Sequence, residues 1–597
     1  MKYKLMYRVF AGLSFIVSLI TYLLTVQPSV PFWDCGEFSS AAIWQQVPHP
    51  PGAPLFLLLG KLFHIIIPFG DQAWRINMVS VVASAVTIFL LYIITVKVIE
   101  NFLEEPIKDF GHALAVYGSA FVGAAAFTFS DTFWFNAVES EVYATSTLFV
   151  ALIVYLMMRW NEKADEPGHE RYLLLIFYLI GLSIGVHLLS ILTIFSIVLT
   201  VYYRKYEVNL KSFIVMGIIA LVTFFIVYPF VVKYIPAFLA GHTPNKTEAR
   251  EYAVEDSIFL VILAYAFIVG VLYLVYYTWK KNMRTLNLAS LAIVLMLLGY
   301  TTYTQILLRS NANPPMNENE PENFSKLSSY LGREQYGNAP MWPRRYHTDS
   351  YYTQRYNKRN DRGEYIYGRW NPPSTETVFR SDGQRISVEN WTNVNVSGEL
   401  NYMWKYQISH MYLRYFAWNF IGRMGDIQDR SPVPYFTDKK IEKINYGSGY
   451  KDIFPINFYL LPFLFGLWGI IYHFSRDKRM AFIYLVLFLV SGVLMALQQN
   501  QQEPQPRERH YFYAASFMVW ALWIGVGTYG AIESLLKKKI SAIVASVIII
   551  ISLFAVPVNM AAQGWFMHSR AGNYIPFDYS YNILQSTEEN AIIFTNG

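Results

Sequence analysis

The sequence predicts an all-α polytopic membrane protein, and three observations lead to this fold class. Only 15% of the 597 residues are charged, whereas a soluble protein needs roughly a quarter to cover its surface. Apolar stretches long enough to cross a bilayer recur along the chain. When these stretches are threaded alternately through the membrane, every joint on one side is basic. We therefore expect about 13 transmembrane helices and one large extracytoplasmic insert.

The expected spans follow from the length of each apolar run, since about 20 residues cross the hydrocarbon core. The first run leads into Gln27-Pro28-Ser29-Val30-Pro31 without a small-x-small cleavage site, so we interpret it as a retained helix. One long run over 171–203 is divided at Gly185-Val186-His187. The expected spans are 9–26, 74–97, 113–131, 142–159, 171–187, 188–203, 211–235, 257–278, 286–307, 455–474, 480–497, 511–531 and 540–558.

Basic residues orient these spans. Threading the helices alternately makes every joint on one side basic, and the positive-inside rule identifies that side as cytoplasmic. The N-terminus is then cytoplasmic, and the large insert is expected on the non-cytoplasmic face. The basic residues on the cytoplasmic side are Lys2, Lys4, Arg8, Lys97, Lys108, Arg159, Lys163, Arg171, Arg204, Lys205, Lys211, Lys280, Lys281, Arg284, Arg476, Lys478, Arg479, Lys537, Lys538 and Lys539.

The chain divides into four expected parts. An N-terminal transmembrane module covers 1–307 and includes outer juxtamembrane helices within 27–73. A polar, aromatic-rich insert covers 308–454, with an interfacial helix over 401–420. C-terminal transmembrane helices cover 455–558. Residues 559–597 begin a soluble outer domain with a helix over 577–586 and a buried strand over 591–595, after which the chain ends, so we expect a fragment of a longer protein.

The stretch Trp33-Asp34-Cys35-Gly36-Glu37-Phe38 is the first candidate site. Asp34 and Glu37 are spaced i, i+3 and would share one face of a helix start. Two carboxylates at the outer mouth of a membrane protein suit general-base chemistry. The same spacing is also close to a capping box, with Asp34 as the N-cap. Both interpretations stay open at this stage.

Further candidates lie at the same predicted face. His49 sits in a rigid, proline-rich run that presents its imidazole near the mouth. Glu139 and Glu141 lie at the start of a span, where a carboxylate is either functional or stabilises the helix N-terminus. His187 lies at the outer end of a span, either as a substrate-binding residue or as a buried histidine bonded to a backbone carbonyl.

Two arginine clusters are candidates for binding phosphate. Arg507 and Arg509 crowd the outer end of the twelfth expected span, where basic residues are normally sparse. Arg333 lies in a similar but weaker cluster in the insert. Guanidinium groups bind phosphate through a bidentate geometry and a permanent charge. A network holding down the outer domain is the structural alternative.

The sequence also excludes several classes. It has no Walker loop and no dinucleotide fingerprint, which excludes transport driven by a nucleotidase domain in this chain. With the single cysteine Cys35 there is no intrachain disulfide and no cysteine metal site. The net charge of +6 fits cytoplasmic anchoring, not nucleic-acid binding. No metal and no cofactor is expected to be required, although Glu139 and Glu141 are compatible with a divalent cation.

Taken in order, these motifs resemble a family of Bacteroidota membrane proteins related to the animal transmembrane O-mannosyltransferase of plexin-type domains. The family pattern has Asp after Arg-Glu-Arg, where this chain has His510. The motifs that carry the resemblance are Trp33-Asp34-Cys35-Gly36-Glu37-Phe38, His49-Pro50-Pro51-Gly52, Glu139-Ser140-Glu141-Val142-Tyr143 and Pro506-Arg507-Glu508-Arg509-His510-Tyr511-Phe512-Tyr513.

The resemblance implies a GT-C glycosyltransferase fold and a polyprenyl-phosphate sugar donor held among membrane lipid. It implies Asp34 as the catalytic base with Glu37 as its neighbour, mannose as the sugar, and Ser or Thr of an exported protein as the acceptor. A glycolipid acceptor is the variant within this class. A lipid or glycan transporter or flippase is the rival from another class and predicts charged residues in mid-span. A non-catalytic scaffold predicts that Asp34 and Glu37 are replaceable.

Overall fold

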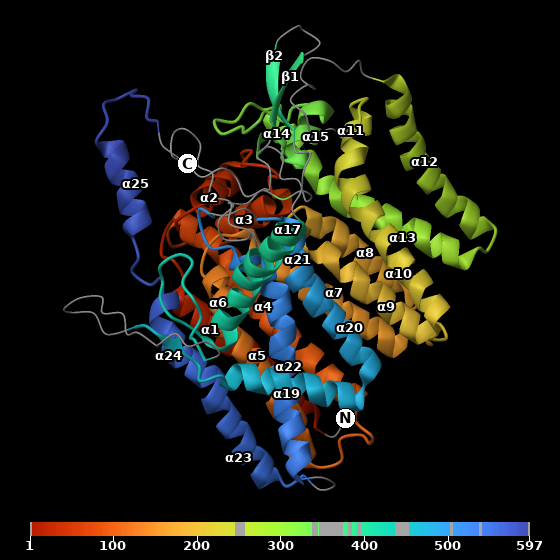
Figure 1. Cartoon of the computed structure of the whole chain (residues 1–597), viewed down its shortest axis with the longest axis vertical. Coiled ribbons are helices and arrows are strands. Elements are labelled where there is room, and N and C mark those ends of the chain that lie inside the picture. The colour runs from red at the N-terminus through yellow and green to blue at the C-terminus, as the bar shows by residue number, and fades with distance from the viewer. Residues whose placement is uncertain are drawn as a thin grey trace.

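The computed structural model describes residues 3–244, 257–336, 344, 374–379, 385–390, 396–435, 453–501, 505–536 and 540–594. This part of the chain is almost entirely helical, which confirms the all-α fold class. The helices form one bundle, with α2, α3, α14 and α15 at one end and the N-terminus at the other (Figure 1). We call these the α2 end and the N-terminal end.

The elements run in the following order. The first half comprises α1 (Lys4–Thr25), α2 (Cys35–Trp44), α3 (Pro54–Ile66), α4 (Gln72–Asn101), α5 (Phe110–Thr128), α6 (Asp131–Ala137), α7 (Val142–Lys163), α8 (Glu170–Ile184), η1 (Leu188–Thr193), α9 (Ile194–Lys205), α10 (Leu210–Phe225), η2 (Ile226–Tyr234), α11 (Ile235–Leu239), α12 (Ile258–Lys280), α13 (Arg284–Tyr300), η4 (Thr301–Tyr303) and α14 (Thr304–Ser310). The second half comprises α15 (Phe324–Gly332), η5 (Glu334–Tyr336), β1 (Ser374–Phe379), β2 (Arg385–Asn390), α17 (Val396–Tyr402), η6 (Met403–Leu413), α18 (Arg414–Phe420), β3 (Gly422–Arg423), β4 (Ile456–Asn457), α19 (Leu461–Arg476), α20 (Lys478–Leu489), η7 (Val490–Leu494), α21 (Met495–Gln499), η8 (His510–Tyr513), α22 (Ala514–Leu536), α23 (Ala542–Leu553), η9 (Phe554–Val558), α24 (Asn559–His568) and α25 (Ile575–Gln585).

The protein is a multi-pass membrane protein with 11 helices, among the described residues, that are long and apolar enough to cross a bilayer. The other two expected spans form shorter helices, α8 with 15 residues and α19 with 16. The division at Gly185-Val186-His187 is confirmed, because α8 ends there and η1 follows. Helix α19 starts late since Ile456 and Asn457 pair with Gly422 and Arg423 in a short antiparallel sheet.

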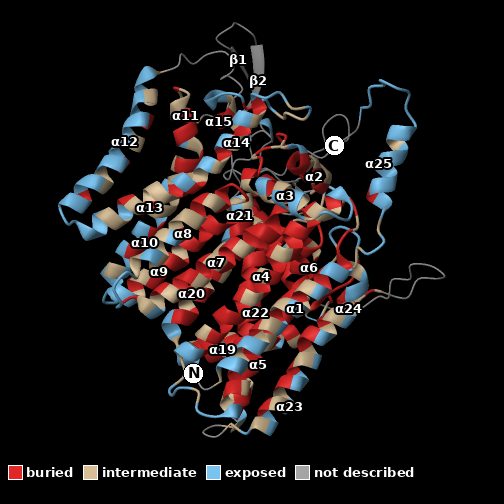
Figure 2. Cartoon of the chain, turned by 180° about the vertical axis from the view of Figure 1, so that it is seen from behind, coloured by how far each residue is buried: buried red, intermediate tan, exposed pale blue. Residues whose placement is uncertain are grey.

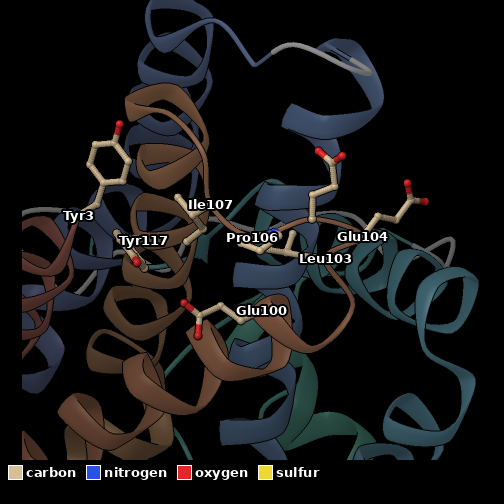
Figure 3. A pocket seen from close by; sticks show the side chains of 8 residues that line it. Tyr3, Glu100, Leu103, Glu104, Pro106, Ile107 and Tyr117 are labelled. Carbon is tan, nitrogen blue, oxygen red and sulfur yellow. The ribbon is translucent and has the colours of Figure 1, made fainter. Parts of the chain in front are cut away.

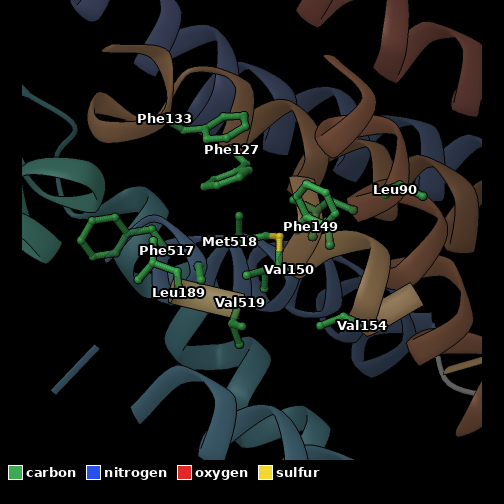
Figure 4. Packing of buried hydrophobic residues seen from close by; sticks show 14 of the residues in the cluster. Leu90, Phe127, Phe133, Phe149, Val150, Val154, Leu189, Phe517, Met518 and Val519 are labelled. Carbon is green, nitrogen blue, oxygen red and sulfur yellow. The ribbon is translucent and has the colours of Figure 1, made fainter. Parts of the chain in front are cut away.

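Helices α4, α5, α7 and α22 form the buried centre of the bundle, whereas α12 lies at its margin (Figures 1 and 2). The most apolar window of the helix over His510–Leu536 is 94% buried, against 11% for Ile258–Lys280. Phe127 and Phe133 stack with ring centroids 4.2 Å apart, close to Met518 of α22 (Figure 4). The exposed faces of the marginal helices are therefore those available to lipid.

Helices α5 and α22 approach closely because Gly123 meets the backbone of α22. A Cβ at Gly123 would lie 2.6 Å from the Ala521 carbonyl oxygen and 2.9 Å from the Gly525 nitrogen, whereas one at Gly217 of α10 would meet nothing within 4 Å. We expect Gly123→Ala to destabilise the fold by about 1–3 kcal/mol through overpacking. Gly217→Ala is the matched control and is expected to be neutral or stabilising, because alanine favours helix by up to about 1 kcal/mol.

Thermal unfolding of both variants in detergent checks this prediction. A lower midpoint for Gly123→Ala with an unchanged or higher midpoint for Gly217→Ala is the expected result. Equal midpoints for the two variants would show that the close approach of α5 and α22 is not as described.

Several of the joints that were predicted to be cytoplasmic are linked to one another by ion pairs. Ion pairs link Lys97 with Glu162 and Arg204 with Asp165, and Arg476 lies 3.5 Å from Glu104. These pairs join segments that the alternating threading places on one side. The predicted joint at Lys537-Lys538-Lys539 lies outside the described residues.

The predicted outer segments meet at the α2 end. Helices α2 and α3 occupy the expected 27–73 segment, and the Val47 backbone N–H donates to the Met316 carbonyl at 3.1 Å. The helix expected over 401–420 forms as α17, η6 and α18. Much of the expected insert over 308–454 lies outside the described residues.

The C-terminal region departs from expectation in two respects. The expected helix over 577–586 forms as α25, but the predicted buried strand is wrong over 591–594, which pair with no strand in the described part of the chain and where Phe594 is 93% exposed. The last residue of that predicted strand, Thr595, lies outside the described residues. A β-strand needs a neighbour to satisfy its backbone groups. The last membrane helix, expected over 540–558, is longer than predicted, because α23 continues through η9 and α24 to His568.

Candidate active site

Asp34 occupies the N-cap position of α2, yet its side chain makes no capping hydrogen bond. Its Oδ2 instead forms an ion pair with Nη2 of Arg507 in the loop before α22. The chain reaches Asp34 through Trp33, whose φ of 64° lies in the left-handed region. The contacts of Asp34 therefore favour the site interpretation over the capping box.

Glu37 faces a different cation from Asp34. The His49 backbone N–H donates to Glu37 Oε1 at 2.5 Å, and His49 Nδ1 lies 2.6 Å from Oε2. Burial alone would lower the pKa of His49, but the hydrogen bond and charge of Glu37 outweigh it and raise the pKa. Burial, and the nearby charge of Glu37, raise the pKa of Glu318 beside this pair. The two carboxylates predicted to act on one face thus belong to two neighbouring ion pairs.

Arg507 is the point where the outer loops converge. Besides Asp34, it lies 3.8 Å from Glu141 Oε1, and its guanidinium is 5.3 Å from the Trp33 ring centre and 5.6 Å from that of Tyr511. Burial alone would lower the pKa of Arg507, but Tyr511, Asp34 and Glu141 raise it. Arg507 therefore carries a permanent positive charge in a site with excess carboxylate.

Glu139 and Glu141 are both buried beside Arg507. The loop that carries them is tied to its neighbours, since the Gln27 N–H donates to the Val138 carbonyl at 3.0 Å and Ser140 Oγ lies 3.0 Å from Ser39 Oγ. Burial raises the pKa of Glu139 to about 7 and that of Glu141 to about 8, with the charge of Asp34 adding to both shifts. These two carboxyl groups change protonation near neutral pH.

This titration predicts a pH-dependent stability. The pKa of each carboxyl is raised on folding, so its protonated form is favoured in the folded state and stability is lost as pH rises from about 4.5 to the folded values of about 7 and 8. We expect the thermal midpoint to fall between pH 6 and 8.5. Over this range the free energy of unfolding decreases by up to about 1 kcal/mol per pH unit for each titrating group.

Glu141→Gln mimics the protonated carboxyl and should flatten this dependence while raising the midpoint at pH 8.5. Glu166→Gln is the matched control, because Glu166 is exposed at the N-terminal end. A midpoint of Glu141→Gln that falls with pH as steeply as that of the wild type would contradict the assignment.

The loop carrying Arg507 is held by Glu508, which sequence reasoning named only as part of a motif. Glu508 accepts hydrogen bonds from Arg414 at 2.8 and 3.1 Å, from the Tyr415 hydroxyl at 2.6 Å and from the Asp429 N–H at 2.7 Å. Burial would raise its pKa, but these bonds lower it to about 2. These four charge-assisted hydrogen bonds hold Glu508 in place, and with it the backbone of the neighbouring Arg507.

A second buried cluster adjoins the site and was missed from the sequence. Asp131 Oδ1 lies 3.2 Å from His568 Nε2 and 3.7 Å from Arg423 Nη1. Burial would raise the pKa of Asp131, but the bond to His568 and the charge of Arg423 lower it to about 2. His510, the residue that departs from the family pattern, contacts Thr132 Oγ1 at 3.1 Å through Nδ1. Partners so distant in sequence leave no local signal.

Three other predicted residues lie outside this convergence. Arg509 donates to the Tyr511 hydroxyl at 2.7 Å and to Gln505 at 3.3 Å. His187 packs 5.3 Å from the ring of Tyr143. Arg333 ends α15 in the left-handed conformation and is exposed. None of the three lines the cavity described next.

A cavity of about 290 Å³ opens beside Arg507. Asp34 adjoins it through its neighbours Trp33 and Arg507. The lining residues are Trp33, Phe135, Asn136, Glu139, Glu141, Tyr143, Arg423, Asp426, Gln428, Arg507, Glu508, His510 and Tyr511. A larger cavity of about 470 Å³ lies near Tyr3, Glu100 and Tyr117 and shares no lining residue with the first (Figure 3). The convergent charges make the smaller cavity the candidate site.

The chemistry available at the smaller cavity is that of a carboxylate, a guanidinium and two carboxyls that titrate near neutrality. Among the described residues, no group of three or more His, Cys, Asp or Glu is arranged to hold a metal ion. The divalent cation that Glu139 and Glu141 are compatible with stays a prediction.

One protein-family model matches about the first third of the chain. Residues 34–210 match the model of the protein O-mannosyl-transferase TMEM260 N-terminal domain. The chain is 30% identical over 162 residues to protein O-mannosyl-transferase tmem260 of Dictyostelium discoideum, covering 27% of this chain and 18% of that protein. It is 28% identical over 183 residues to the Mus musculus protein O-mannosyl-transferase TMEM260, covering 31% and 24%. The matches thus span about a fifth of these relatives' length.

Two solved structures of the Archaeoglobus fulgidus oligosaccharyltransferase also align with the chain. The apo form aligns with a TM-score of 0.39 at 11% identity, covering 93% of this chain and 56% of that one. The form tethered to an acceptor peptide containing the NVT sequon aligns with a TM-score of 0.40 at 10% identity, covering 94% and 56%. The segment that is similar to the TMEM260 N-terminal domain contains Asp34, Glu37, His49, Glu139 and Glu141.

Proposed function

We propose that this chain is a GT-C type glycosyltransferase of the bacterial inner membrane. It transfers mannose from a polyprenyl-phosphate donor to Ser or Thr hydroxyls of exported proteins on the periplasmic face. The observation that carries the proposal is the convergence of Asp34 and Arg507, from segments far apart in sequence, beside one cavity at the α2 end. The similarity of residues 34–210 to a domain of protein O-mannosyl-transferases supports the sugar and the acceptor class.

The reaction needs a base and an anion-binding group. The acceptor hydroxyl attacks the anomeric carbon, a carbon–oxygen bond forms there, and the bond to the phosphate oxygen breaks. Asp34 accepts the hydroxyl proton as that bond forms. The polyprenyl phosphate leaves with the bonding electron pair, and Arg507 stabilises its charge through a guanidinium that stays protonated. Neither step requires a metal or a cofactor, and Glu139 and Glu141 would provide the ligands if a divalent cation takes part.

Substrate binding also frees the base. The Asp34 carboxylate is engaged by Arg507. A donor phosphate offers Arg507 a planar bidentate partner, so the guanidinium exchanges Asp34 for the phosphate. The carboxylate then faces the acceptor hydroxyl only when the donor is present.

The direct test is transfer of radiolabelled mannose from polyprenyl-phosphate mannose to a pool of exported proteins by the purified chain in detergent. Label on protein that is released by β-elimination, as expected for a Ser or Thr linkage, supports the proposal. Label on lipid only would assign a glycolipid acceptor instead. No labelling with any polyprenyl-phosphate sugar would contradict the proposal.

A further inference from the structure

Trp33 has a backbone conformation that a bulky side chain disfavours. Its φ of 64° lies in the left-handed region, where glycine and asparagine are the residues that fit without steric cost. The position lies one residue before the N-cap of α2, and glycine would adopt this turn conformation without steric cost. A tryptophan there costs conformational energy, and that cost needs a compensating role for the side chain.

Packing does not supply the compensation. The Trp33 side chain is 61% exposed, whereas Trp134 and Trp523 are fully buried in the same protein. A tryptophan stabilises a fold mainly through the area that it buries. The strained and exposed indole therefore points to binding at this position.

The surroundings of Trp33 define what it would bind. Trp33 is the residue before Asp34, and its ring lines the 290 Å³ cavity. The centre of the ring lies 5.3 Å from the guanidinium carbon of Arg507. The same cavity is lined by Glu139, Glu141 and Asn136, which are hydrogen-bonding groups. An apolar face next to a cation and several polar groups matches a pyranose ring, whose C–H face is apolar and whose hydroxyls are polar.

We propose that Trp33 is the platform on which the sugar of the polyprenyl-phosphate donor stacks. This inference rests on the proposed function and deepens it. Because Arg507 is beside the ring and is assigned to the donor phosphate, the group next to that phosphate is the donor sugar. The indole then holds the anomeric carbon near Asp34.

The test compares two lipids on the full chain in detergent, namely polyprenyl-phosphate mannose and polyprenyl phosphate without sugar. Binding of each is measured for the wild type, Trp33→Gly, Trp33→Phe and Trp44→Ala. Trp44 is the matched control, because it is 67% exposed at the other end of α2 and does not line the cavity. The thermal midpoint is recorded for every variant.

Trp33→Gly is expected to bind the mannose-bearing lipid about tenfold more weakly, as for the loss of one stacked ring. Its affinity for polyprenyl phosphate should stay within about twofold of the wild type, and its midpoint should be equal or higher because the strain is relieved. Trp33→Phe should recover most of the affinity, and Trp44→Ala should match the wild type.

Equal weakening of both lipids by Trp33→Gly, a lower midpoint, or an unchanged preference for the sugar would each overturn the role of Trp33. If the wild type itself shows no preference for the mannose-bearing lipid, the proposed donor fails, and this inference fails with it. The wild-type measurement thus separates the two failures.

Discussion

Asp34→Asn is expected to lower the rate of mannose transfer by about 10²–10⁴-fold, the usual contribution of a positioned general base. Asparagine keeps the shape of the side chain but cannot accept the hydroxyl proton. Because Asp34 makes no capping hydrogen bond to α2, the substitution removes no bond that the helix start needs. The loss should therefore appear in kcat, with donor binding retained.

Single-turnover transfer at saturating donor measures this effect, and direct donor binding is recorded on the same samples. Asp578→Asn is the control, because Asp578 is an exposed carboxylate on α25. A transfer rate of Asp34→Asn equal to that of the wild type would exclude Asp34 as the base. An equal loss of donor binding and transfer would assign it to substrate binding instead.

Arg507→Ala is expected to reduce transfer by about 10²–10³-fold, the range found when a group stabilising transition-state charge is removed. The variant also leaves Asp34 and Glu141 without their shared cation. Arg507→Lys should fall between the two, since an ammonium keeps the charge but loses the bidentate geometry.

Arg509→Ala is the matched control for this prediction. Arg509 is two positions away, yet it contacts Tyr511 and Gln505 and does not line the cavity. The transfer rate of Arg509→Ala should stay within about threefold of the wild-type rate, which is less than the tenfold change that about 1.4 kcal/mol of activation free energy produces. Equal losses for the two arginine variants would mean that the phosphate is held by the cluster as a whole.

The fold was largely predictable from the sequence because it depends on long apolar runs and basic joints. Each of the expected spans corresponds to a helix, and the break at Gly185-Val186-His187 was located correctly. The sequence did not reveal where a helix begins when the residues before it pair with a distant strand. The start of α19 is delayed by the pairing of Ile456 with Arg423, and no local pattern signals that contact.

The sequence pointed to the charged residues that meet at Arg507, but not to how they pair. Asp34, Glu139, Glu141 and Arg507 were all identified, because charged residues at the mouth of a membrane protein are rare and costly. The i, i+3 spacing of Asp34 and Glu37 suggested that these two carboxylates act together. Instead, Asp34 pairs with Arg507 and Glu37 pairs with His49. Spacing along one helix does not reveal which loops meet its face.

Three further residues were either missed or given no role from the sequence, because what sets them apart is a tertiary contact or a backbone conformation. Asp131 is notable only beside His568, and Glu508 only beside Arg414. Trp33 is notable only because of its backbone conformation and exposure. An alternating pattern or a motif cannot report these features.

A double-mutant cycle between Asp34 and Arg507, measured on single-turnover transfer, tests whether the two residues serve one step. Arg507 takes the leaving phosphate and thereby frees Asp34, so the two should act as a unit. Asp34→Asn combined with Arg507→Ala is therefore expected to be no slower than the worse single variant, within about threefold. A double variant whose loss equals the product of the two single losses would contradict this coupling, because the residues would then act independently.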